Sequence, residues 1–172
     1  MNNWTRESVD ATLKAYKAEK GRFLHLSIEL SVLGEKKDRA LRRALADASA
    51  PQAQVITDMP RGGNRVGSKV EDIAVKFADG WMPEELADLN TEIDKIEAEA
   101  NRCGMVVQYV EAWLSALTER ERWIVEHQFI NEEIWDNVLT DYQRLFDRGL
   151  SRDTLKRIKM RGLERIYQMV GV

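Results

Sequence analysis

The chain has 172 residues and a mass of 19.8 kDa, which suits one globular domain or one small domain with an extended arm. Its 44% hydrophobic and 32% charged residues are typical of a folded soluble protein and exclude an intrinsically disordered chain. The formal net charge is −3, no apolar run approaches the ~20 residues that span a bilayer, and the N-terminus does not resemble a secretory signal. The single cysteine excludes an internal disulfide, and together these features predict a cytoplasmic protein without a membrane segment.

A long amphipathic helix is predicted from Glu7 to about Asp47. Its apolar residues are Val9, Leu13, Tyr16, Phe23, Leu26, Leu30, Leu33, Leu41 and Leu45. Most of these are spaced by three or four, as one face of a helix requires, and only Gly21 and Gly34 weaken the helix-forming pattern.

A linker is predicted at about 48–82, because the prolines at positions 51, 60 and 83 and four of the ten glycines cluster there. Within it, MPRGGNRVGSK nearly matches the phosphate-binding loop of nucleotide hydrolases. The Lys and Ser are transposed and no buried strand precedes the loop, so we do not predict a nucleotide site. The stretch indicates either a turn that leads into a helix or an accessory phosphate contact by Arg61 and Arg65.

A second long helix is predicted from Glu84, because Pro83 and the acids after it favour a helix start. Ten apolar residues follow in alternating steps of three and four: Leu86, Leu89, Ile93, Ile96, Ala100, Cys103, Val107, Val110, Leu114 and Leu117. This stripe must face a partner, either in an ordinary bundle or in a coiled coil or hairpin with the first helix. Cys103 is expected in that core and not as a nucleophile. Residues 1–117 are thus expected to form a helical arm.

Residues 118–172 are predicted to form a separate module. Thr118 and Glu121 match the capping box of a helix with the sequence ERERWIVEHQFI. A further helix is expected from Asn131 to about Phe146, followed by a tight turn at DRGL. Because the apolar stripe ends before this module, we expect few core contacts between module and arm, so that the fragment folds and binds by itself.

The last helix is predicted from Arg152 to about Met169, with Ser151 as its N-cap. From Asp147 to Val172 there are seven Lys and Arg residues and three acids, a net of +4, so the rest of the chain carries −7. The basic residues form two outward rows, Arg152 with Lys156 and Lys159, and Arg157 with Arg161 and Arg165. Gly162 suggests that another element packs closely there. The layout is that of a helix-turn-helix that binds duplex DNA, and a solvated basic face is the alternative interpretation.

The segments LTERERWIV and SRDTLKRIKMRGLERI resemble the promoter-reading C-terminal module of bacterial sigma factors. With ITDMPRGGNRVGSKVEDIA before a heptad helix, the chain from about Val55 to Ile166 is similar to the small sigma-like late transcription regulators of bacteriophages, the ArpU/RinA-like group. The resemblance implies base contacts by the first residues of the last helix, here Arg152, Asp153, Lys156 and Arg157. In one departure, the helix expected at 132–146 is about twice as long as its sigma-factor counterpart.

We therefore expect an all-α, sequence-specific transcription regulator that binds double-stranded DNA, and the resemblance implies a phage late-gene activator in the cytoplasm of the bacterial host. The expected DNA-binding residues are Arg152, Asp153, Lys156, Arg157, Lys159 and Arg161. The arm is expected to form a homodimer or to contact the host RNA polymerase.

Two other functions fit the same sequence. One is a DNA-binding packaging component similar to a small terminase subunit, which is expected to form a large ring. The other is a coiled-coil adaptor that binds protein and no DNA. We do not expect an enzyme, a cofactor or a metal site, because His25 and His127 lie far apart and no nucleophile motif occurs.

Overall fold

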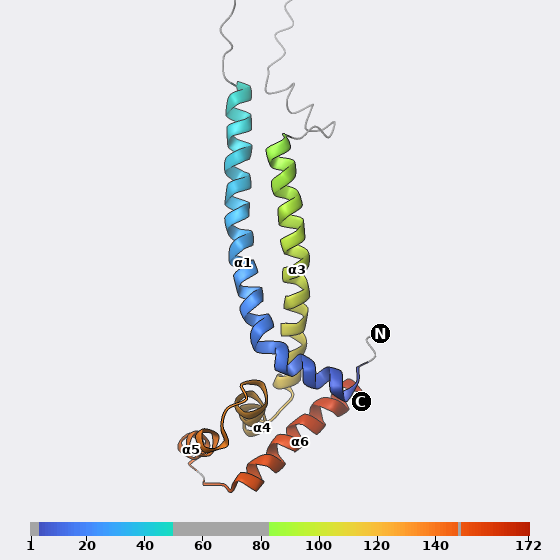
Figure 1. Cartoon of the computed structure of the whole chain (residues 1–172), viewed down its shortest axis with the longest axis vertical. Helices are drawn as coiled ribbons and strands as arrows, with labels where there is room; N and C mark the ends of the chain where they lie inside the picture. The colour runs from blue at the N-terminus through green and yellow to red at the C-terminus, as the bar shows by residue number, and fades with distance from the viewer. Residues whose placement is uncertain (1–3, 50–82, 148) are drawn as a thin grey trace, which may run out of the picture. The chain divides into compact units, whose positions relative to one another are not determined.

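The computed structural model describes residues 4–49, 83–147 and 149–172, which are mostly helical, with no strand among them (Figure 1). The helices are α1 (Arg6–Ser49), α3 (Glu84–Ser115), α4 (Glu119–Ile124), the π-helix η1 (Val125–Ile130), α5 (Trp135–Phe146) and α6 (Arg152–Val170). The predicted all-α class is confirmed for this described part. Arg61 and Arg65 of the expected linker lie outside it.

The chain divides into two compact units whose limits differ from the expected boundary at residue 117. Unit 1 contains residues 1–25 and 99–172, and unit 2 contains residues 26–98. Both α1 and α3 therefore contribute one part to each unit. The expected arm of residues 1–117 is not a unit by itself, because the start of α1 and the end of α3 belong with the C-terminal helices.

The core of unit 1 joins α1, α3, η1 and α6. Its buried members are Val9, Leu13, Val110, Trp113, Leu114, Leu117, Val125, Ile130, Leu163, Ile166 and Tyr167. Leu13 of α1 and Ile166 of α6 are completely buried in the same cluster. The expectation that few core contacts cross residue 117 is therefore wrong, since the apolar side of α6 packs with both long helices.

A second core cluster in unit 1 holds α5 and α6 against α4. Its buried members are Ile124, Val138, Tyr142 and Leu155. The Trp123 ring meets the rings of Tyr142 and Phe146 edge-on, with centroids 5.6 and 6.1 Å apart. Helices α5 and α6 thus pack in one cluster, and Asp147 closes α5 in a left-handed conformation with a φ of 49°.

Helix α5 begins at Trp135, four residues later than predicted. Residues 125–130 form a π-helix, which ends with a hydrogen bond from the Asn131 N–H to the Glu126 carbonyl at 2.9 Å. Glu132 then turns the chain with a φ of 53°. This left-handed residue interrupts the helix expected to start at Asn131, so α5 has 12 residues.

The apolar stripe predicted on α3 is confirmed, because all ten of its positions are buried or half-buried. The two long helices lie side by side within each unit (Figure 1). In unit 1, a Cβ on Gly104 would lie 3.0 Å from the Phe23 ring. In unit 2, Leu86 of α3 is buried, as is Leu33 of α1. Cys103 is only 1% exposed, which confirms its place in the core.

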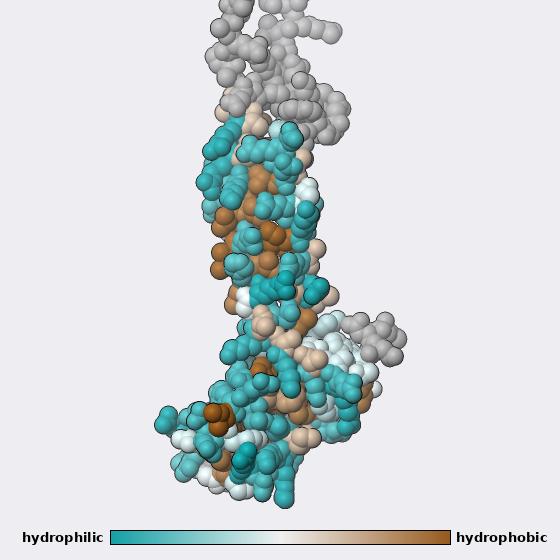
Figure 2. Space-filling view, viewed as in Figure 1, coloured by the Kyte–Doolittle hydropathy of each residue, from teal (hydrophilic) through white to brown (hydrophobic). Residues whose placement is uncertain are grey.

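Unit 2 also exposes apolar side chains. Ile28 is 65%, Val32 is 45% and Leu41 is 37% exposed, all on α1. Figure 2 shows hydrophobic residues that reach the surface among hydrophilic ones along this part of the two long helices. The α1–α3 pair of unit 2 therefore leaves apolar surface that another molecule can cover.

Candidate nucleic-acid interface

The basic helix α6 begins where the sequence predicts. Ser151 is extended, and its Oγ accepts a hydrogen bond from the Thr154 N–H at 3.3 Å, which satisfies one of the donors left open at a helix start. Asp153 places a carboxylate in the first turn, where the helix dipole favours negative charge. At the other end Gly171 closes the helix with a φ of 84°, a left-handed conformation that suits glycine.

The side of α6 predicted to be apolar is buried. Leu155 and Ile166 are fully buried, and Ile158 is half-buried. A Cβ on Gly162 would lie 3.2 Å from Cγ2 of Val125, which confirms the predicted close packing at this glycine. These contacts fix which side of α6 faces water.

The outward side of α6 carries most of the predicted DNA-binding residues. Arg152, Asp153, Lys156, Arg157 and Arg161 are all exposed. The Arg152 guanidinium lies over the Trp135 ring, 5.5 Å from its centroid, and the Lys156 ammonium lies 3.7 Å from the Asp153 carboxylate. We call the four cations of this set the basic surface of α6. They lie within the first three turns of the helix.

Lys159 is placed differently from the other predicted residues. Its side chain is half-buried, and its ammonium donates to Oε1 of Gln128 at 2.7 Å. It also lies 5.9 Å from the Phe129 ring centroid and 5.8 Å from that of Trp135. Burial lowers the pKa of Lys159, and the nearby positive charges of other lysines lower it further. Lys159 therefore faces η1 and α5 at the edge of the basic surface.

Arg165 is exposed, as its place in the outward row predicts, but its charge is paired. Its Nη1 lies 2.8 Å from Oε2 of Glu121, whose side chain is only 4% exposed. The same oxygen accepts hydrogen bonds from the Thr118 N–H at 3.1 Å and from the Thr118 Oγ1 hydroxyl at 2.8 Å. The predicted capping box is thus confirmed, and Arg165 ties it to α6 by neutralising a buried carboxylate.

The start of α1 holds the second half of α6, which the sequence reasoning missed. The Tyr167 hydroxyl donates to Oδ1 of Asp10 at 2.6 Å, and Arg6 pairs with Glu164 at 3.0 Å. Burial raises the pKa of Tyr167 well above its usual range, and the bond to Asp10 raises it further. The only sequence signal was Val9, which begins the apolar pattern of α1 and is fully buried in the shared core.

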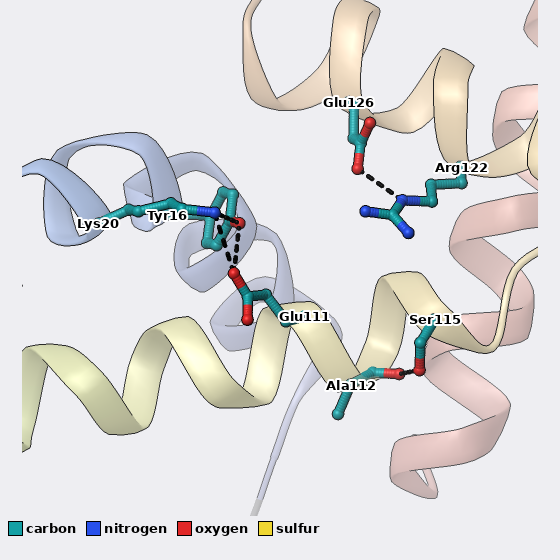
Figure 3. A network of polar contacts seen from close by, with 7 residues as sticks. All are labelled: Tyr16, Lys20, Glu111, Ala112, Ser115, Arg122 and Glu126. Atoms are coloured by element: carbon teal, nitrogen blue, oxygen red, sulfur yellow. Dashed lines mark hydrogen bonds and ion pairs between the residues drawn. The ribbon is translucent and has the colours of Figure 1, made fainter.

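A network of paired charges lies elsewhere in unit 1 (Figure 3). The Lys20 ammonium donates to the Tyr16 hydroxyl at 2.9 Å and to Glu111 at 3.0 Å, and Arg122 donates to Glu126 at 2.8 Å. These bonds raise the pKa of Lys20 and of Arg122, and the bond from Lys20 lowers the pKa of Glu111. Lys20 and Arg122 are thus each bonded to a carboxylate, whereas Arg152, Arg157 and Arg161 of α6 have no carboxylate partner among the described residues.

The remaining polar side chains give no sign of a metal or membrane site. His127 stacks on Trp123 and pairs with Glu133 at 2.9 Å between Nδ1 and Oε1. Among the described residues no three metal-ligating side chains come together. Nor does any described helix have the length and apolar character that a membrane crossing requires.

Comparisons with family models, with curated proteins and with solved structures found no match to this chain. A function for this chain therefore rests on its fold and on the placement of its charged residues.

Proposed function

We propose that the protein is a sequence-specific transcription regulator that binds double-stranded DNA with α6 as its recognition helix. The observation that carries this proposal is the basic surface of α6, in which four cations are exposed on one helix while its other side is fixed in the core. A helix presented in this way can enter the major groove and supply the charge that phosphates require. The sigma-like resemblance further supports a phage late-gene activator.

The proposal assigns different contacts along α6. Arg152, Asp153 and Lys156 lie in the first turns, where side chains of a recognition helix reach base edges. An arginine or lysine pairs with guanine, and a carboxylate accepts from the cytosine amine. The resemblance assigns Arg157 to the bases as well, and Arg161, one turn further along, contacts phosphates, which position the helix without reading sequence.

Binding can be measured on duplexes selected from a random pool by the full-length protein. Replacing Lys156 and Arg157 by Glu is expected to reduce the affinity for the selected duplex by at least ~100-fold, because a good base contact contributes ~1–3 kcal/mol. Each lost phosphate contact should also reduce the slope of log affinity against log salt concentration by ~0.9. The matched control replaces Lys17 and Arg102, two exposed cations of unit 1 outside α6, by Glu. Equal effects of both double variants, or no duplex binding by the parent protein, would refute the assignment.

For unit 2 we propose that the exposed apolar side chains pack against a second copy of the chain. The exposed cations of α1 here, Lys36, Arg39, Arg42 and Arg43, gather toward its C-terminal end, although Glu29, Glu35 and Asp38 are exposed on the same helix, whereas the exposed charged residues of α3 up to Ala98 are acidic except Lys95. In a symmetric dimer α1 of each copy can therefore lie against α3 of the other, with Ile28 and Val32 covered by this contact. A dimer also supplies two recognition helices for two half-sites.

Light scattering after size-exclusion chromatography tests this dimer. The parent chain is expected to have twice the monomer mass, and replacing Ile28 and Val32 by Asp is expected to give a helical monomer. A monomeric parent chain would refute the dimer and leave RNA polymerase as the partner to test. A large ring would instead favour the packaging function.

A further inference from the structure

A cavity in unit 1 lies beside the basic surface of α6. Its volume is about 320 Å³, and its lining residues are Lys14, Gln128, Phe129, Glu132 and Lys159. They come from α1, from the π-helix and the turn after it, and from α6. Gln128 and Phe129 belong to the π-helix η1, and π-helical turns occur often at functional sites.

Two lysines from distant parts of the sequence meet at one aromatic ring of this cavity. The ammonium of Lys14 lies 5.7 Å from the Phe129 ring centroid, and that of Lys159 lies 5.9 Å from it. Lys159 uses one of its three donors on Oε1 of Gln128 at 2.7 Å. That bond also orients the Gln128 amide, whose nitrogen adds two further donors. Hydrogen-bond donors therefore dominate the lining.

The electrostatics of the cavity favour an anion. Lys159 is half-buried, and the positive charges of Lys156 and Lys14 oppose its own charge, whereas Asp10 compensates it in part. An anion between the two cavity lysines would remove that repulsion. The acidic residue of the lining is Glu132, which lies 3.8 Å from Lys14 with a side chain 70% exposed. So exposed an ion pair is weak, and an entering anion can displace Glu132 into water.

We propose that Lys14, Gln128 and Lys159 form a phosphate-binding site, occupied in the DNA complex by a backbone phosphate of the duplex that lies along α6. The assignment of the phosphate to DNA rests on the proposed function. Lys159 follows the exposed Lys156 by three residues on the same helix, so a backbone that contacts the basic surface passes the mouth of the cavity. The start of α1 thereby becomes part of the nucleic-acid interface.

The test measures the affinity of the full-length protein for its selected duplex over a range of salt concentrations. Lys14→Gln is expected to reduce affinity ~3–10-fold at moderate salt and to reduce the salt slope by ~0.9, equally on selected and unrelated duplexes. Lys17→Gln is the matched control, since Lys17 is an exposed lysine of α1 that does not line this cavity. Lys14 is 55% exposed at its side chain, so its replacement should leave the melting temperature unchanged.

The outcomes separate the site from the proposed function. If the protein binds DNA and Lys14→Gln has the affinity and salt slope of Lys17→Gln, the phosphate site is wrong and the function stands. If the protein binds no duplex, the function fails, and inorganic phosphate is titrated while the Gln128 side-chain amide is followed by NMR. If the phosphate titration saturates in the parent chain but not in Lys14→Gln, the site binds free phosphate and its assignment to DNA is wrong. Without saturation the site itself is wrong.

Discussion

Replacement of Leu13 by Ala tests whether the start of α1 holds the C-terminal helices in place. Leu13 is completely buried in the cluster that also contains Leu114 of α3 and Ile166 of α6. Removing its side chain loses the transfer free energy of the buried carbons and leaves a cavity, a change that costs about 2–5 kcal/mol in other cores. We expect the upper half of that range, because rigid helices on all sides limit collapse.

The control is Leu145→Ala on α5, the same chemical change at a side chain that is 60% exposed. Surface substitutions away from special features change stability by about 0.5 kcal/mol or less. Urea unfolding of both variants, followed by circular dichroism and by tryptophan fluorescence, gives the two free energies at one protein concentration. In a chain of this size each lost kcal/mol should lower the melting temperature by roughly 2–4 °C.

The same reasoning changes the expected behaviour of the fragment 118–172. Without the two long helices, five apolar residues of the shared core lose partners: Val125, Ile130, Leu163, Ile166 and Tyr167. At ~1.5–3 kcal/mol per buried side chain this loss rivals the whole stability of a domain, about 5–15 kcal/mol. The fragment should be largely unfolded by circular dichroism. If it is cooperatively folded, or if Leu13→Ala costs no more than Leu145→Ala, the shared core does not hold α6.

Three further predictions concern polar groups of unit 1. The Tyr142 hydroxyl is buried without a hydrogen-bond partner among the described residues. Tyr142→Phe should therefore leave the free energy of unfolding unchanged or raise it by up to about 1 kcal/mol, and a clear decrease of that free energy in urea unfolding would contradict this. Arg165→Met removes the cation beside the buried Glu121 carboxylate, which keeps its hydrogen bonds from Thr118, and should cost about 1–3 kcal/mol in the same assay, against less than about 0.5 for the exposed Arg161→Met. Because the pKa of Lys159 is lowered on folding, its charged form opposes folding. The stability of the parent chain should therefore rise relative to Lys159→Met as pH increases toward the ordinary lysine value of 10.5, and a constant difference would refute the shift.

Local signals predicted the helices well. The three-and-four spacing of apolar residues located α1 and α3, and the Thr118–Glu121 pair located the start of α4. Gly162 correctly indicated close packing, because its cost in a helix interior needs a compensating contact. Such features depend on neighbours within one or two turns, which the sequence shows directly.

The tertiary arrangement was harder to predict, because it depends on pairs far apart in the chain. Tyr167 and Asp10 are 157 positions apart, and neither stands in a motif that names the other. The π-helix and the left-handed Glu132 occur where η1 packs with α1, α5 and α6, so no local sequence pattern predicts them. Contacts of this kind also explain why one predicted cation, Lys159, is half-buried and why another, Arg165, is paired with Glu121.

The two halves of α6 have different tasks, and this division fits the proposed function. The half after Gly162 is fixed by Arg165 on Glu121, by Tyr167 on Asp10, and by the shared core. The half before it carries the basic surface, whose four cations have no buried carboxylate partner among the described residues. A recognition helix needs both features, since a base contact is useful only if the helix cannot tilt away from the groove. Because α1 helps to hold α6 in place, Asp10→Ala should weaken this support by removing the hydrogen bond from Tyr167. We expect this variant to discriminate less between selected and unrelated duplexes and to keep the salt slope of the parent chain.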